Sequence, residues 1–282
     1  LHPRVRRQRQ MCIRDRIDTH SHLFLEEFSE DFPQVIERAR AAGVTHIFMP
    51  NIDSTTIEAM LSACSVYKGY CFPMIGLHPT SVNDNYEKEL EIVARELKFS
   101  KEYVAIGEIG MDLYWDKTYL KEQQIVLDKQ VNWALEYDLP IVIHCRDAFD
   151  YIYKVLEPYK KTPLRGIFHS FTGTAEEATR VLEFSDFFIG INGVVTFKKS
   201  HLPEILAGIP LEKIVLETDS PYLTPVPNRG KRNESAYVKD TLMKVSEIYG
   251  MSPEAVGDVT SENALKAVSY THLRAHETLS DL

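Results

Sequence analysis

The sequence predicts a closed (β/α)8, or TIM, barrel, and three observations support this fold class. Short β-rich runs alternate with helix-forming segments along most of the chain, which is typical of βαβ units around a parallel sheet. Eight such units fit in about 250 residues, the usual size of this barrel. The sequence contains no G-x-G-x-x-G after the first strand and no G-x-x-x-x-G-K-[ST]. A doubly wound open sheet is therefore only the alternative.

The eight predicted strands are spaced along the chain in the order that the barrel requires. They are 17–23, 44–50, 71–77, 103–109, 140–145, 164–169, 187–193 and 213–219. Helical spacing is clearest at 119–137, where apolar side chains recur every three or four residues. Asp31 marks the start of the first helix and Gly43 its end, and Asp53 and Ser54 begin the second.

The two ends of the chain differ from the body in composition. Residues 1–16 contain six Arg and one Asp, and neither 1–16 nor 269–282 shows apolar periodicity or a strand pattern. We interpret both as unstructured, non-native flanks, with a genuine basic arm at 1–16 as the alternative. The barrel is then a single domain at 17–268.

The composition excludes several classes of protein. With 44% hydrophobic and 26% charged residues, the chain has enough apolar material for a sizeable core. No apolar run approaches the roughly 18 residues that a membrane span needs. The four cysteines form no C-x-x-C pair, which favours reduced thiols and a cytoplasmic location. The net charge of −9 argues against bulk attraction to nucleic acid, although a few local cations could hold a phosphate.

Six polar residues at the predicted carboxyl ends of strands are the candidate metal ligands. They are His20, His22, Glu108, His144, His169 and Asp219. Barrel enzymes build their active sites on this face. His20 and His22 are two residues apart in a predicted strand, so both should point inward. Imidazoles with carboxylates suit divalent ions such as Zn, Mn or Co, and six ligands exceed one tetrahedral centre. Two ions about 3.5–4 Å apart, bridged by a carboxylate, account for the set.

Further residues are expected around this centre. Asp18 and Glu217 each precede a candidate ligand by two residues, so we expect them to orient imidazoles from behind, with simple filling of the barrel as the alternative for Asp18. The expected substrate contacts are one histidine and four cations: His78, Arg146, Arg229, Lys231 and Arg232. Such cations can hold a phosphate. The loop aromatics Tyr114, Trp115 and Phe171 are candidates for stacking on bases, with simple packing as the alternative.

Eight stretches resemble one known family, the TatD family of metal-dependent DNases, among the amidohydrolase-like barrels. They are IDTHSHL (17–23), GLHP (76–79), GEIGMDLYWD (107–116), PIVIHCRDAF (140–149), IFHSFTG (167–173), IGINGVVTFK (189–198), LETDSPYLTP (216–225) and NRGKRNESAYV (228–238). The resemblance implies a TIM barrel with two divalent ions, which could be Mg, Mn, Zn or Co. It implies one ion at His20, His22, Glu108 and Asp219, and a second at Glu108, His144 and His169. Glu108 would then bridge them.

The predicted reaction is hydrolysis by a metal-activated water. Asp219 is expected both to bind metal and to accept the proton of the water, with Glu108 as the other catalytic carboxylate. The resemblance implies a deoxyribonuclease, and a small cleft on a monomer suits the end of single-stranded DNA. The alternatives are a barrel hydrolase acting on an ester or amide, such as D-aminoacyl-tRNA, and a metal-binding scaffold without catalysis.

Overall fold

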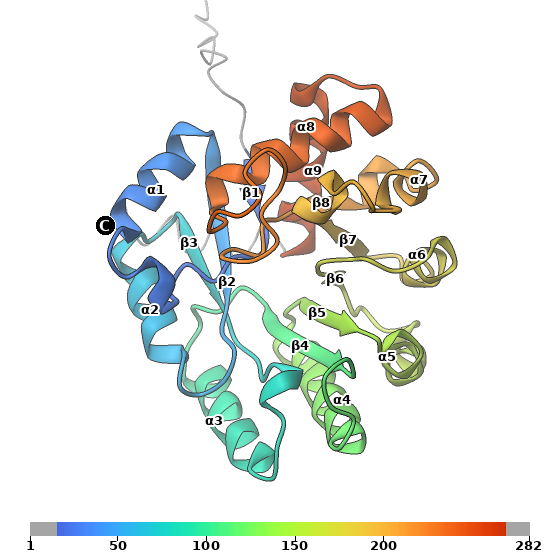
Figure 1. Cartoon of the computed structure of the whole chain (residues 1–282). Coiled ribbons are helices and arrows are strands. Elements are labelled where there is room, and N and C mark those ends of the chain that lie inside the picture. The colour runs from blue at the N-terminus through green and yellow to red at the C-terminus, as the bar shows by residue number, and fades with distance from the viewer. Residues whose placement is uncertain (1–15, 269–282) are drawn as a thin grey trace, which may run out of the picture.

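The computed structural model describes residues 16–268, and within this range eight parallel strands surround a common axis with helices outside them (Figure 1). The strands are β1 (Arg16–Asp18), β2 (Val44–Pro50), β3 (Cys71–Met74), β4 (Ile106–Asp112), β5 (Ile141–Arg146), β6 (Gly166–Phe168), β7 (Phe187–Ile191) and β8 (Ile214–Leu216). They pair in the order β1-β2-β3 and β4-β5-β6-β7-β8, and single bridges join the two groups. The predicted (β/α)8 barrel is confirmed.

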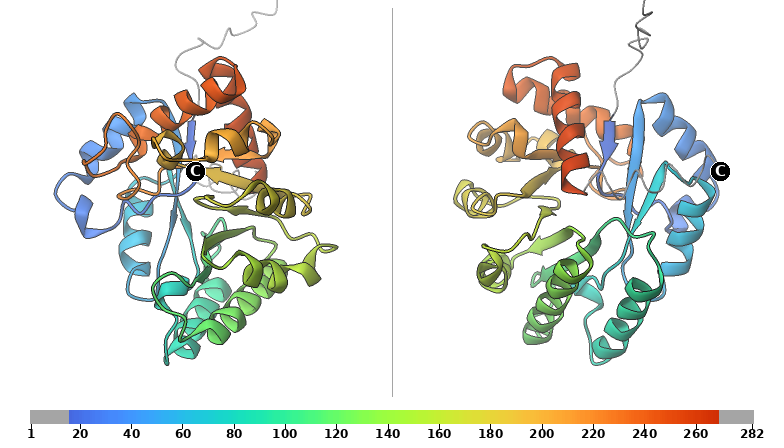
Figure 2. Two further views of the ribbon diagram at one scale, coloured as in Figure 1. Left: turned by 45° about the vertical axis from the view of Figure 1, so that its right-hand side comes forward. Right: turned by 180° about the vertical axis from the view of Figure 1, so that it is seen from behind.

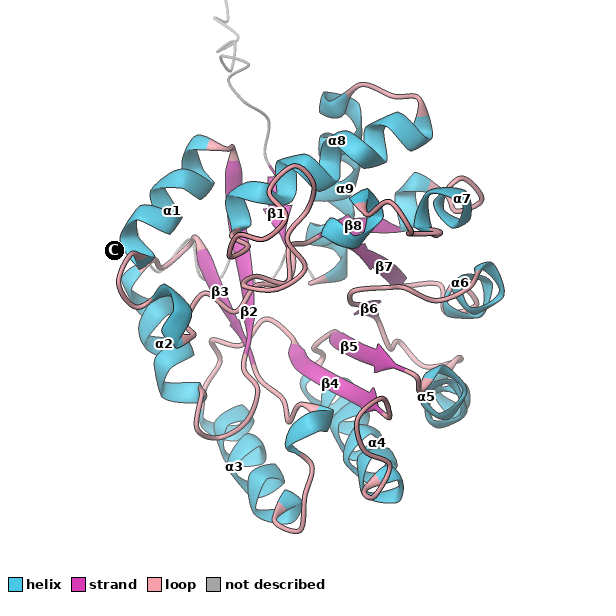
Figure 3. Ribbon diagram, in the orientation of Figure 1, coloured by secondary structure: helices cyan, strands magenta, loops and turns pink. Residues whose placement is uncertain are grey.

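The helices lie around the outside of the strands (Figure 3). They are α1 (Phe32–Ala41), α2 (Ile57–Val66), α3 (Tyr86–Phe99), α4 (Leu120–Tyr137), α5 (Phe149–Leu156), α6 (Ala175–Val181), α7 (Leu202–Leu206), α8 (Val238–Tyr249) and α9 (Pro253–Ala267). Across residues 16–268, none of them combines the length and the apolar character that crossing a membrane requires.

Several predicted boundaries need correction. Strand β1 ends at Asp18, so His20 and His22 lie in the loop that follows it. Glu108 lies near the middle of β4 and not at its end. Helix α2 begins at Ile57, because Asp53 instead closes a local turn by accepting the backbone N–H of Thr55 at 3.0 Å. Local capping signals therefore located the helices only to within a few residues.

The predicted flanks fall largely outside the described residues. Residues 1–15 and 269–282 are not described, so the interpretation of these ends as non-native segments stays a prediction. Arg16, which we assigned to the first flank, pairs with Val44 of β2 and thus belongs to the barrel.

The barrel closes between the two ends of the domain. Asp18 accepts hydrogen bonds from the backbone N–H of Thr218 at 2.8 Å and from its hydroxyl at 2.7 Å. The backbone N–H of Asp219 donates to the carbonyl of His20 at 2.9 Å, and that of His22 donates to Ser220 at 2.8 Å. These contacts hold the segments after β1 and β8 side by side.

Helix α9, in red at the C-terminal end of the colour scale, packs against β1, β7 and β8 (Figure 2). Ala264 and Ala267 of α9 are buried together with Ile17 of β1 and Val215 of β8. Their small side chains allow the helix to approach the strands closely, so this contact is filled by apolar groups.

Candidate active site

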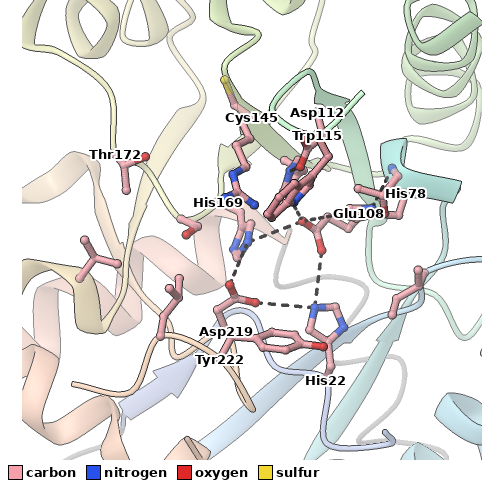
Figure 4. Close-up of a pocket in the computed structure, with 17 residues that line it drawn as sticks. His22, His78, Glu108, Asp112, Trp115, Cys145, His169, Thr172, Asp219 and Tyr222 are labelled. Atoms are coloured by element: carbon pink, nitrogen blue, oxygen red, sulfur yellow. Dashed lines mark hydrogen bonds and ion pairs between the residues drawn. The ribbon is translucent and has the colours of Figure 1, made fainter. Parts of the chain in front are cut away.

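The six candidate ligands converge at the carboxyl-terminal end of the barrel, and Figure 4 shows four of them, His22, Glu108, His169 and Asp219, around one cavity. Three overlapping groups have ligand atoms that all lie within 4.8 Å of one another. They are His20 with Glu108 and His169, His20 with His22 and Asp219, and His78 with Glu108 and His144. Residues from six different strands or strand ends thus meet in one cluster, as their predicted positions required.

Glu108 lies at the centre of the cluster and faces imidazoles on both sides. Its Oε2 is 3.0 Å from Nε2 of His20 and 3.6 Å from Nε2 of His22. Its Oε1 is 2.9 Å from Nδ1 of His144 and 3.6 Å from Nε2 of His169. The two oxygens of this one carboxylate therefore lie near two different pairs of imidazole nitrogens.

The protonation of the His20 region suits a cation. Burial lowers the pKa of His20 well below its ordinary value and that of His22 to about 4, so both rings are neutral at pH 7. Burial alone would raise the pKa of Glu108, but His20 and neighbouring imidazoles hold it well below its usual range. The two Nε2 atoms lie only 3.2 Å apart beside a carboxylate, an arrangement that a shared divalent ion would stabilise.

His144 is held by a carboxylate that the sequence analysis missed. Its Nε2 is 2.9 Å from Oδ2 of Asp112, and its Nδ1 faces Glu108. Burial alone would lower the pKa of His144, but its hydrogen bonds to Asp112 and Glu108 raise it to about 9. Asp112 lies four residues after Glu108 on β4, so strand alternation could have identified it.

His169 is oriented by Glu217. Its Nδ1 is 3.0 Å from Oε1 of Glu217, which also accepts the backbone N–H of Ser170 at 2.6 Å. Burial alone would lower the pKa of His169, but Glu217 and the other carboxylates raise it to about 10. A methyl group at Gly190 would lie 2.5 Å from Oε2 of Glu217, so only glycine leaves room for this carboxylate. Asp18, by contrast, touches Thr218 and not the ring of His20.

Asp219 lies at the wall of the cluster and lines the cavity. Its two oxygens are 3.7 Å from Nε2 of His22 and 3.8 Å from Nε2 of His169. Burial raises the pKa of Asp219 to about 7, against the lowering influence of His169. Its backbone φ of 59° is left-handed, a conformation that Asp and Asn tolerate better than most residues.

His78 lies closer to the centre than the sequence analysis implied. Its Nε2 is 3.4 Å from Oε1 of Glu108. Its Nδ1 accepts the backbone N–H of Thr80 at 3.1 Å, and burial lowers its pKa. The neutral ring must then carry its proton on Nε2, because an accepting nitrogen bears none. His78 therefore presents an N–H donor to the cavity.

The cavity above the cluster has a volume of about 600 Å³. Its wall includes Arg146, Trp115 and Tyr222 besides His78 and the ligand candidates. Phe171 is only 6% exposed and packs in the core, so the prediction that it could stack on a base does not fit its position.

The predicted basic residues divide into two groups. Arg146 lies at the cavity with its guanidinium 3.8 Å above the ring of Tyr114. Arg232 instead forms an ion pair with Asp31 at 2.8 Å. Arg229 stacks on Phe197 at 4.0 Å, and neither it nor Lys231 or Arg232 lines the cavity. Their expected role with substrate stays a prediction, and the structure brings only Arg146 and His78 to the centre.

A parallel barrel with such a cluster at its carboxyl-terminal face defines a class, the metal-dependent barrel hydrolases. The family pattern described as TatD related DNase matches residues 17–269. The chain belongs to this family of metal-dependent hydrolases, and the resemblance seen in the sequence is confirmed.

Individual relatives agree with this assignment. The metal-dependent hydrolase YabD of Bacillus subtilis, itself called uncharacterized, is 38% identical over 88% of this chain and 96% of its own length. A protein of Erwinia billingiae named 3′-5′ ssDNA/RNA exonuclease TatD is 32% identical over 88% of this chain and 97% of its own. The crystal structure of YJJV, a TatD homologue of Escherichia coli, superposes with a TM-score of 0.84 at 27% identity, covering 89% and 97% of the two chains.

Proposed function

We propose that this protein is a divalent-metal-dependent phosphodiesterase that removes nucleotides from the end of single-stranded DNA. The observation that carries the proposal is Glu108, whose two oxygens face separate sets of imidazoles, so that one carboxylate can serve two cations. The name of the Erwinia relative supports a single-stranded nucleic acid as substrate, with RNA included and digestion from the 3′ end. A monomeric state and a cytoplasmic location stay predictions from the sequence.

The donor set fits two ions from among Mg, Mn, Zn and Co. His20, His22 and Asp219 would hold one, His144 and His169 the other, and Glu108 would bridge them. Bound ions would supply Lewis acidity, which polarises a phosphate oxygen and lowers the pKa of a water. Asp112 and Glu217 would keep the rings of His144 and His169 in orientation.

Three residues of the protein are assigned to proton transfer and to binding of the phosphate. Asp219 lines the cavity and accepts the proton of the attacking water. His78 donates from Nε2 to a phosphate oxygen, since its tautomer is fixed by the N–H of Thr80. Arg146, held over Tyr114, attracts a neighbouring phosphate.

The direct test compares two substrates. A labelled single-stranded oligonucleotide and a D-aminoacyl ester are incubated with purified protein, with and without Mn²⁺ or Mg²⁺. We expect stepwise shortening of the oligonucleotide only with metal. Hydrolysis of the ester with no cleavage of the oligonucleotide would contradict the proposal and favour a carboxylic ester hydrolase.

The role of Asp219 is tested by Asp219→Asn. Asparagine keeps the shape and tolerates the left-handed backbone, but it accepts no proton. We expect bound metal, measured by elemental analysis, to be largely retained, while kcat falls by about 10²-fold or more. Normal turnover with metal in place would show that Asp219 is at most a ligand.

A further inference from the structure

Two exposed aromatic rings stand at the mouth of the cavity. Trp115, in the loop after β4, is 77% exposed, and Tyr222, in the loop after β8, is 53% exposed. Both line the cavity. Figure 4 shows Trp115 beside Glu108 and His169, and Tyr222 on the other side, beside Asp219 and His22. Apolar rings are thus presented to solvent on two sides of the candidate metal centre.

The other aromatic residue of the β4 loop has a different role. Arg146 covers one face of Tyr114 at 3.8 Å, and the ring of Trp115 stands at 90° to it. Tyr114 therefore supports Arg146 most closely, whereas the guanidinium lies 5.6 Å from the centroid of the Trp115 ring and leaves most of that ring exposed. No ion pair of the Arg146 guanidinium is found among residues 16–268, so its donors can serve a ligand.

Tyr222 is held on a rigid base. Its backbone N–H donates to the carbonyl of Asp219 at 2.8 Å, and its own carbonyl accepts the side-chain N–H of Asn233 at 2.6 Å. Asn233 is fully buried. The backbone of Tyr222 is thereby held next to Asp219, the residue that we assign to proton transfer.

We propose that Trp115 and Tyr222 form a stacking subsite for unpaired nucleobases beside the phosphate that is cleaved. This inference rests on the proposed function. Every base offers two flat faces, so stacking holds any sequence, whereas bases within a duplex have both faces covered. A chain of net charge −9 cannot rely on a long basic surface for affinity. Stacking next to Arg146 supplies an attraction that selects single-stranded ends.

The test reads out binding without turnover. The chain contains two tryptophans, so Trp133→Phe leaves Trp115 as the sole indole. The metal-loaded protein is titrated with a dye-labelled, phosphorothioate-linked oligonucleotide, and with a copy whose last two 3′ positions lack bases. Fluorescence anisotropy reports binding, and quenching of Trp115 reports stacking. We expect quenching only by the complete strand, and affinity about tenfold weaker for the abasic copy.

Variants assign the effect to the rings. Trp115→Ala and Tyr222→Ala should bind the two oligonucleotides within about twofold of each other, while Tyr222→Phe keeps the preference. Phe99→Ala is the matched control, because Phe99 is 76% exposed on α3 and does not line the cavity.

The outcomes separate the two proposals. Binding of both strands with equal affinity and without quenching overturns the subsite and leaves the proposed function standing. A preference that Trp115→Ala removes and Tyr222→Ala does not overturns the assignment of Tyr222. No binding of either strand, together with hydrolysis of the D-aminoacyl ester, overturns the proposed function and the subsite with it.

Discussion

The two sides of the candidate metal centre share Glu108 but differ in burial and protonation. On the His20 side, formed by His20, His22 and Asp219, the two imidazoles are 0% and 6% exposed. On the His144 side, formed by His144 and His169, the two imidazoles are 19% and 3% exposed.

This difference in protonation predicts an order of metal binding. Burial gives His22 a pKa of about 4, so its lone pair is available at neutral pH. His144 and His169, whose pKa values are raised to about 9 and about 10, must each release a proton before they can bind an ion. A first ion should therefore bind on the His20 side, and the His144 side should bind a second ion more weakly. The predictions below test this asymmetry.

The largest effect is expected from Glu108→Gln, which removes the element common to both sides. Glutamine has the same shape but no charge, so the two proposed ions would lose their shared carboxylate. We expect kcat to fall by about 10³-fold or more, and the metal content to fall below that of Asp219→Asn. Elemental analysis beside oligonucleotide assays measures both. Retained content of two ions would refute the bridging role.

Single imidazole losses should separate the two sides. His144→Ala should lower activity by about 10²-fold at low metal concentration, with partial rescue by added Mn²⁺. His20→Ala should not be rescued, because this ring is fully buried and stacks on His169 with centroids 3.5 Å apart. Titration of both variants with Mn²⁺ provides the comparison, and equal rescue would remove the distinction between the sides.

Metal binding on the His144 side should depend on pH more strongly than on the His20 side. Between pH 9 and 7 the raised pKa values of His144 and His169 keep a proton on each ring, so each unit of lower pH should weaken this site by up to about a hundredfold. His22 holds no proton in this range. Calorimetry with Mn²⁺ in two buffers of different protonation enthalpy measures the proton release. Identical pH dependence for both ions would contradict the assignment.

The smallest effects concern the basic residues. Arg146→Ala should weaken oligonucleotide binding and lower the slope of log affinity against log salt by about 1. Arg232→Ala should leave that slope unchanged and lower Tm by about 2–4 °C, because its partner is Asp31. A lower slope for Arg232→Ala would instead support the sequence-based expectation that this loop contacts phosphate.

Arg146 and Arg232 also show which positions in space could be predicted from the sequence and which could not. Arg146 is the last residue of β5, two positions after His144, and the end of a barrel strand has a defined position in space. Arg232 stands in a loop where charge alone suggested a phosphate site, but its partner Asp31 lies 201 positions earlier. An ion pair between such distant segments leaves no periodic pattern in the sequence. Residue spacing therefore could not distinguish a cation that binds phosphate from one that pairs with a carboxylate of the protein.

The same reasoning applies to the metal centre. Strand ends identified the six candidate ligands, because each follows a β-rich run. The assignment of His78 to this centre depends on how the loop after β3 turns, which strand positions do not determine: in the structure its Nε2 lies 3.4 Å from Oε1 of Glu108. Strand alternation places Asp112 on the same face as Glu108, but the predicted strand ends at residue 109, three residues before Asp112.

The closure between Asp18 and Thr218 has a consequence for how the protein is made. The two residues are 200 positions apart, and His20 is hydrogen-bonded to Asp219 beside them. During synthesis the amino-terminal histidines leave the ribosome long before the eighth strand exists. The centre therefore cannot assemble cotranslationally on the first half-barrel, and a chain released early would carry His20 and His22 without the partner that completes their site. Acquisition of the full metal complement thus marks a finished chain.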